Sequence, residues 1–128
     1  MTLNEKFQTL ALVCLGASLG SMARFLIYSW VGRTFTDTYL ATLTVNILGS
    51  FLIGVLFVIF SEIHSPRLQL LLMTGLLASF TTFSTLSLDA LRLFMNGQAH
   101  LALAHLGGQV VFGVSFCYVG VKIGQRLL

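Results

Sequence analysis

The third long apolar run of the chain contains the stretch Thr74-Gly75-Leu76-Leu77-Ala78-Ser79-Phe80-Thr81-Thr82-Phe83-Ser84-Thr85-Leu86-Ser87. Six hydroxyl side chains fall within its last nine residues, a density that is unusual for a helix crossing a membrane. Serine and threonine hydroxyls bond back to helix carbonyls, and adjacent β-branched threonines crowd a helix. The stretch therefore predicts a third helix that is broken mid-membrane, where irregular backbone must be buried in protein or line a wet cavity.

The composition of the whole chain fits a membrane protein. Of its 128 residues, 56% are hydrophobic and 9% are charged, whereas soluble domains carry roughly 25% charged residues. A helix needs about 20 residues to cross a hydrocarbon core roughly 30 Å thick. The chain therefore has room for four such helices and for no sizeable globular domain beside them.

Four segments of the chain contain no Asp, Glu, Lys or Arg, and each is long enough to cross a membrane with help from its flanks. They run over residues 7–23, 38–61, 68–88 and 93–121. We predict an all-α, multi-pass membrane protein with a single domain, residues 1–128. Its transmembrane helices are expected at about 7–31, 38–62, 67–95 and 99–126.

The cations are scattered singly along the chain, which argues against a nucleic-acid partner. One predicted side of the membrane collects Lys6, Arg67, Lys122 and Arg126, and the other collects Arg33 and Arg92. This bias is weak, so charge alone leaves open a single orientation or insertion in both. Because four helices hardly enclose a conduit alone, an oligomer is expected.

Two polar side chains, one inside an apolar run and one at the end of a run, are candidate site residues. Asn46 has Thr42 and Ser50 at four-residue offsets, so one helix face carries an amide between two hydroxyls. This face is either an interhelical hydrogen-bond patch or a row of donors for an anion. Arg24 ends the first run, where it either snorkels to the interface or places a positive charge at a vestibule.

The fourth run adds His105 and Gln109, four residues apart. The sequence places the four acids, Glu5, Asp37, Glu62 and Asp89, at or beyond the ends of the runs. An interior with donors and no carboxylate suits an anion better than a cation or a proton relay. No metalloprotease, nucleophile-elbow or paired-carboxylate motif is present, so we expect no enzyme.

Several motifs together resemble one known family. They are Gly16-Ala17-Ser18-Leu19-Gly20 with Arg24, Thr42-Leu43-Thr44-Val45-Asn46, Thr74-Gly75, and Thr81-Thr82-Phe83-Ser84-Thr85. With these motifs the chain resembles, over essentially its whole length, the Fluc fluoride channels, also called CrcB. The last motif is highly specific, whereas the others alone are not.

The resemblance implies an antiparallel, dual-topology homodimer that exports fluoride passively across the cytoplasmic (inner) membrane. The implied partners are fluoride, the lipid bilayer and a second copy of the chain. The implied cofactor is a central sodium ion held by the backbone carbonyls of Ala78 and Thr81. The residues implied for the fluoride pathway are Asn46, Phe83, Ser84, Thr42, Gln109, Leu86 and Thr82, with Arg24 at the vestibule.

Two departures from the family pattern keep alternatives open. Ala78-Ser79 replaces a pair of glycines, and Leu86 occupies the place of a second pore phenylalanine. One alternative is a small dimeric multidrug-type transporter, which should carry an intramembrane acid. Another is a non-conducting partner subunit of a heterodimeric channel, which should be inert alone.

Overall fold

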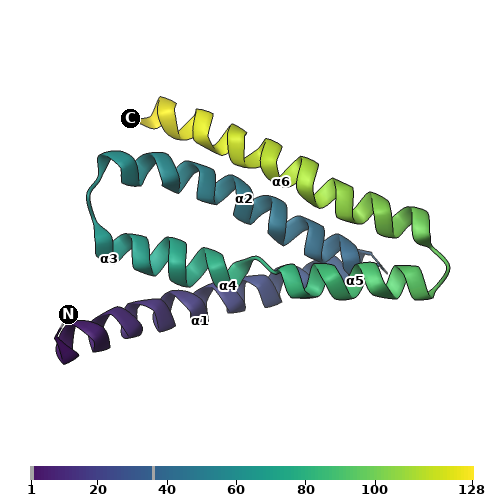
Figure 1. Ribbon diagram of the computed structural model, residues 1–128, viewed down its shortest axis with the longest axis horizontal. Helices are drawn as coiled ribbons and strands as arrows, with labels where there is room; N and C mark the ends of the chain where they lie inside the picture. The colour runs from purple at the N-terminus through teal and green to yellow at the C-terminus, as the bar shows by residue number, and fades with distance from the viewer. Residues whose placement is uncertain (1, 36) are drawn as a thin grey trace.

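The computed structural model describes residues 2–35 and 37–128, and these form an all-helical chain (Figure 1). The elements in chain order are α1 (Leu3–Thr34), α2 (Thr38–Glu62), α3 (Pro66–Gln69), η1 (Leu70–Leu77), α4 (Ala78–Phe80), α5 (Phe83–Met95) and α6 (Ala99–Leu127). The elements α3, η1, α4 and α5 follow one another as one interrupted helix, Pro66–Met95.

Four helices within the described residues are long and apolar enough to cross a membrane. They are α1, α2, the interrupted helix Pro66–Met95, and α6. The shortest, α2, has 25 residues, which at about 1.5 Å per residue exceeds a hydrocarbon core of roughly 30 Å. The predicted all-helical class and the four apolar helices are confirmed, and both chain ends lie at the same end of the molecule (Figure 1).

The first helix begins outside its apolar run because a capping box fixes its start. Glu5 N–H donates to Thr2 Oγ1 at 3.2 Å, and Thr2 N–H donates to Glu5 Oε2 at 2.7 Å. The two bonds satisfy backbone donors that the first helical turn leaves without partners. The helix therefore starts at Leu3, ahead of the charged residue Lys6.

The helices lie in a layer in the order α6, α2, interrupted helix and α1 (Figure 1). The layer is not flat, because α1 also contacts α2 and α5 also contacts α6. Glycines allow the closest approaches. A Cβ at Gly16 or Gly20 would overlap the carbonyl oxygen of Leu71 or Leu76, so α1 touches η1 backbone to backbone. On the other side of the layer, Gly120 does the same between α6 and α2. The small residues thus serve packing within one chain.

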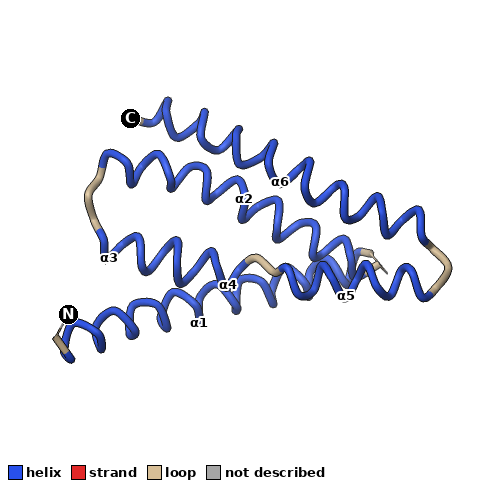
Figure 2. Tube along the Cα trace, viewed as in Figure 1, coloured by secondary structure: helices blue, strands red, loops and turns tan. Residues whose placement is uncertain are grey.

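The interruption of the third helix lies at two threonines, as a loop between α4 and α5 (Figure 2). Thr81 has φ −80° and ψ 160°, and Thr82 has φ −151° and ψ 119°, so both are extended. The Thr81 hydroxyl bonds back to the Leu77 carbonyl at 3.1 Å. The Thr82 hydroxyl accepts from the Thr85 N–H at 3.2 Å and so caps α5.

The segment before the break, η1, is a π-helix, which sequence reasoning did not predict. Such wide turns are rare and usually short. Here eight residues, Leu70–Leu77, adopt it where the helix passes over α1. A Cβ at Gly75 would come within 2.8 Å of the Val13 carbonyl oxygen. The π-helical turns thus lie at a backbone-to-backbone helix contact, and the short α4 separates them from the break.

Gly20→Ala is expected to destabilise the protein by about 1–3 kcal/mol, because the new methyl group meets the Leu76 backbone and not a flexible side chain. The thermal unfolding midpoint of purified protein in detergent measures this. Gly32→Ala is the matched control on α1, since a Cβ there meets nothing within 4 Å and alanine favours a helix over glycine. Equal midpoints for the two variants would contradict the packing argument.

Candidate functional site

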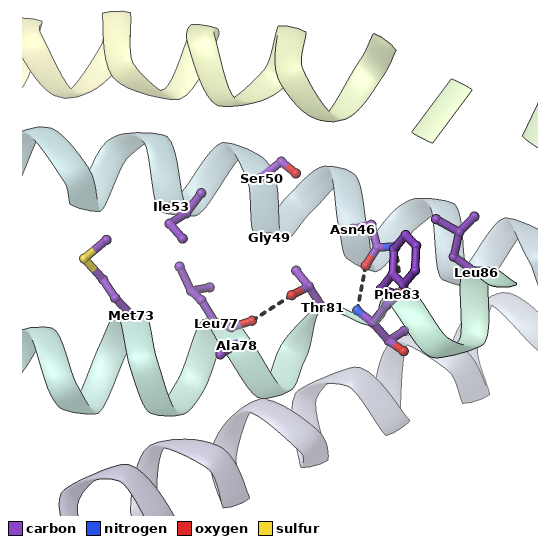
Figure 3. Close-up of a pocket in the computed structure, with 11 residues that line it drawn as sticks. Asn46, Gly49, Ser50, Ile53, Met73, Leu77, Ala78, Thr81, Phe83 and Leu86 are labelled. Carbon is purple, nitrogen blue, oxygen red and sulfur yellow. Dashed lines mark hydrogen bonds between the residues drawn. The ribbon is translucent and has the colours of Figure 1, made fainter. Parts of the chain in front are cut away.

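Two cavities meet at the break in the third helix. The first, about 340 Å³, lies between α2 and the interrupted helix, and Figure 3 draws its lining. The second, about 600 Å³, lies between α1 and the same break and is more polar. Four residues line both cavities: Ala78, Thr81, Thr82 and Phe83. The extended residues Thr81 and Thr82 therefore lie between the two cavities and border both.

The side chain of Asn46 holds the break from α2. Its Oδ1 accepts from the Thr82 N–H at 2.8 Å, and its Nδ2 donates to the Thr82 carbonyl at 3.1 Å (Figure 3 shows the first bond). An extended residue presents both groups on one side, and the amide pairs with them as a neighbouring strand would. The second N–H of Asn46 donates to Gln109 Oε1 at 3.1 Å. Both hydrogens of this amide are thus used inside the chain.

Two hydrogen bonds at the break release two backbone carbonyls from their helical donors. In a continuous α-helix the N–H groups of Thr82 and Thr85 would donate to the carbonyls of Ala78 and Thr81. Here Thr82 N–H donates to Asn46 and Thr85 N–H donates to the Thr82 hydroxyl. The carbonyls of Ala78 and Thr81 therefore lose their helical donors. They are backbone oxygen acceptors on residues that border both cavities.

Buried donors without partners lie on α6. Gln109 is 8% exposed and His105 is 5% exposed. Among residues 2–35 and 37–128, no partner is found for Gln109 Nε2 or for either ring nitrogen of His105. The His105 ring packs edge-on against Tyr39 of α2, with ring centroids 5.4 Å apart. Buried polar atoms are nearly always hydrogen-bonded, so these three atoms are exceptions among the described residues.

Thr42 belongs to a buried hydrogen-bond network with Tyr28 and Asp89. Its hydroxyl donates to Asp89 Oδ2 at 2.5 Å and accepts from the Tyr28 hydroxyl, 2.7 Å away. The expectation that Asp89 lies at or beyond the end of its span is wrong, because α5 continues to Met95 and Asp89 is 3% exposed. The Thr42 hydroxyl supplies a donor that makes the buried carboxylate tolerable. Sequence could not place that donor.

The structure groups the predicted pathway residues in three places. The first cavity is lined by Asn46, Thr82, Phe83 and Leu86, and Phe83 is 80% exposed whereas Leu86 is buried. The second cavity is lined by Ser84 and Arg24, and Ser84 also bonds the Thr82 hydroxyl at 3.2 Å. Gln109 joins the first group through its bond to Asn46, whereas Thr42 lies apart in the Asp89 network.

Arg24 borders a further hollow besides the second cavity. That hollow, about 340 Å³, is lined by Ser21, Arg24, Phe25, Tyr28 and Thr85. An arginine side chain carries a positive charge. Its place fits a fixed positive charge at the mouth of the second cavity, and the face it shares with Gly16 and Gly20 packs on protein.

Fold and site together define a small multi-pass membrane protein with a polar break in one helix. A family model described as "CrcB-like protein, Camphor Resistance (CrcB)" matches residues 11–121. Proteins named "Fluoride-specific ion channel FluC" are similar along most of the chain. The one from Magnetococcus marinus is 38% identical over 92% of this chain and 98% of its own length.

Two further relatives carry the same name. The protein from Stutzerimonas stutzeri is 40% identical over 88% of this chain and 94% of its own length. The protein from Cereibacter sphaeroides is 42% identical over 85% of this chain and 88% of its own length. The chain belongs to the CrcB family.

Thr42→Val is expected to lower the free energy of unfolding by about 1–3 kcal/mol, because the buried Asp89 carboxylate loses its donor. The shift of the thermal midpoint in detergent measures it. Thr44→Val is the control on the same helix, since the Thr44 hydroxyl bonds only back to the Leu40 carbonyl of α2. A midpoint for Thr42→Val no lower than that of Thr44→Val would refute a role for the network in stability.

Proposed function

We propose that this chain is a fluoride-selective ion channel that lets fluoride leave the cell passively across the cytoplasmic membrane, and so lowers internal fluoride. The observation that carries the proposal is the chain-long similarity to proteins named fluoride-specific ion channels, at 38–42% identity in the three relatives above. The polar lining on both sides of the broken helix supports it. The channel needs no enzymatic step and no nucleotide.

The fluoride pathway runs past the break. Hydroxyls of Thr82 and Ser84 and the amide of Gln109 replace part of the water that a small anion must shed. The exposed ring of Phe83 offers its positive edge where water is scarce. Arg24 raises the local anion concentration at the vestibule. Chloride is larger than fluoride and accepts weaker hydrogen bonds, so this narrow row of donors excludes it.

A sodium ion at the break fits the oxygen atoms that the chain offers there. The carbonyls of Ala78 and Thr81 have lost their helical donors to Asn46 and to the Thr82 hydroxyl. Backbone carbonyls are ligands that suit a hard cation. Bound there, sodium would hold the broken backbone together and would supply positive charge near the anion pathway.

A second, antiparallel copy of the chain completes this site in the proposal. Two carbonyls leave most of the coordination of a hard cation open, and Phe83 is 80% exposed at the edge of the first cavity. The weak charge bias of the loops is compatible with insertion in both orientations. In that homodimer the break lies mid-membrane, with the exposed cavity walls covered by the partner.

The two alternatives receive less support. A multidrug-type transporter needs an intramembrane acid at its substrate site, and the buried Asp89 is engaged with the Thr42 hydroxyl at a distance from the break. A non-conducting partner subunit is inert alone, whereas the relatives described above are named as channels. The fluoride channel therefore remains the function that the site supports best.

Purified protein in liposomes loaded with fluoride is expected to release it rapidly, and to release chloride no faster than protein-free liposomes under the same gradient. A fluoride electrode and a chloride electrode follow the two ions. The physical reason is the narrow donor row, which matches the smaller and more strongly hydrogen-bonding ion.

The control replaces sodium on both sides with a large organic cation, which is expected to slow fluoride release if the carbonyl site holds sodium. Release of both anions at similar rates would argue for a non-selective pore. No release from folded, dimeric protein would favour an obligate partner subunit.

Leu86→Phe is expected to speed fluoride release about twofold to tenfold, because a ring edge then faces the pathway where leucine has none. Leu86 borders the first cavity, which has room for the larger side chain. The same liposome assay measures it. Leu86→Met is the control for size and flexibility without a ring, and an equal change in both variants would contradict the ring-edge argument.

A further inference from the structure

We propose that Asn46 is a positioning residue for the anion pathway. In this role the Asn46 amide is held by the Thr82 peptide group and fixes the orientation of the Gln109 amide. Gln109 Nε2 is then the donor offered to the anion. The inference rests on the proposed fluoride channel and names which of the two amides meets the ion. It differs from the expectation that Asn46 itself donates.

The orientation of the Asn46 amide follows from the backbone. The Thr82 N–H can only donate and the Thr82 carbonyl can only accept. The atom 2.8 Å from Thr82 N must therefore be Oδ1, and the atom 3.1 Å from Thr82 O must be Nδ2. The usual ambiguity between the oxygen and nitrogen of a side-chain amide does not arise here.

The orientation of Gln109 follows in turn. The second hydrogen of Asn46 Nδ2 points at Gln109, so the atom 3.1 Å away must be an acceptor, Oε1. Gln109 Nε2 then faces away from Asn46 with both of its hydrogens. It is buried, and it has no partner within residues 2–35 and 37–128. Both hydrogens of Asn46 Nδ2 are engaged in hydrogen bonds, whereas neither hydrogen of Gln109 Nε2 is.

A small anion or water is the guest that suits Gln109 Nε2. The group only donates, so it repels cations, and lipid tails offer no acceptor. His105, four residues earlier on α6, is buried with both ring nitrogens unpartnered and adds a second polar group along the same helix face. The hydrogen bonds thus run from Gln109 Oε1 as acceptor through Asn46 to the Thr82 peptide group. They leave Gln109 Nε2 as a donor without a partner.

The first experiment tests whether Asn46 stabilises the break, and it does not depend on ion conduction. Hydrogen exchange of the Thr82 amide is measured by NMR in detergent micelles. Asn46→Ala is expected to speed this exchange about tenfold or more, because the amide loses its acceptor. Gln109→Glu, which keeps an acceptor for Asn46 Nδ2, and the control Thr44→Val are expected to leave it unchanged. Unchanged exchange in Asn46→Ala would overturn the positioning role.

The second experiment asks which amide meets fluoride, using efflux from liposomes. Asn46→Ala and Gln109→Met are each expected to slow efflux about tenfold to a hundredfold, the scale of one hydrogen bond to a charged group. If Asn46 acts through Gln109, the double variant is no slower than Asn46→Ala alone. Losses that multiply in the double variant would mean that Asn46 donates to fluoride independently, and would overturn the proposal.

Gln109→Glu keeps the proposal testable if Asn46→Ala does not fold. It replaces the outward donor with an acceptor oxygen, so efflux is expected to fall at least as far as in Gln109→Met while Thr82 exchange stays slow. Normal efflux in Gln109→Glu would overturn the role of Nε2. Absence of efflux from the unaltered protein would instead defeat the channel proposal, and the exchange experiment would still decide whether Asn46 holds the break.

Discussion

The side chain of Asn46 makes two hydrogen bonds to the peptide group of Thr82, at 2.8 and 3.1 Å. Within an apolar layer of helices, an unpaired peptide group costs several kcal/mol, so an interrupted helix survives only where a neighbour supplies the missing partners. Asn46 supplies both at once from α2. The released carbonyl of Ala78 and the orientation of Gln109 follow from that pairing, whereas the carbonyl of Thr81 is released by the bond from the Thr85 N–H to the Thr82 hydroxyl.

The tight helix contacts around the break serve the same arrangement. Backbone contact at Gly16 and Gly20 holds η1 against α1, and Gly120 holds α6 against α2. The π-helical turns of η1 come at the first of these contacts, and α4 connects them to the break. At the break itself, a Cβ at Gly49 of α2 would overlap the Thr81 side chain, so α2 and the interrupted helix also approach closely where the short Asn46 side chain spans them.

Polar groups in this chain thus divide into those satisfied within it and those left without a partner. Tyr28, Thr42 and Asp89 satisfy one another, and the hydroxyls of Thr82, Ser84 and Thr85 do the same at the start of α5. Gln109 Nε2 and the His105 ring are buried and unsatisfied within the described part of the chain. Gln109 Nε2 can donate to an anion without giving up a bond within the chain, whereas the hydroxyls of Thr82 and Ser84 must exchange a bond that they already make.

The membrane class, the four apolar helices and the interruption near Thr81 and Thr82 were predictable from the sequence alone, because hydropathy and clustered hydroxyls act locally along the chain. The family resemblance was readable for the same reason, from short contiguous motifs. The burial of Asp89, the wide turns of η1 and the pairing of Asn46 with Thr82 and Gln109 were not. Each depends on which side chain of a distant helix comes within hydrogen-bond or van der Waals reach, and only the packing of the helices sets that distance.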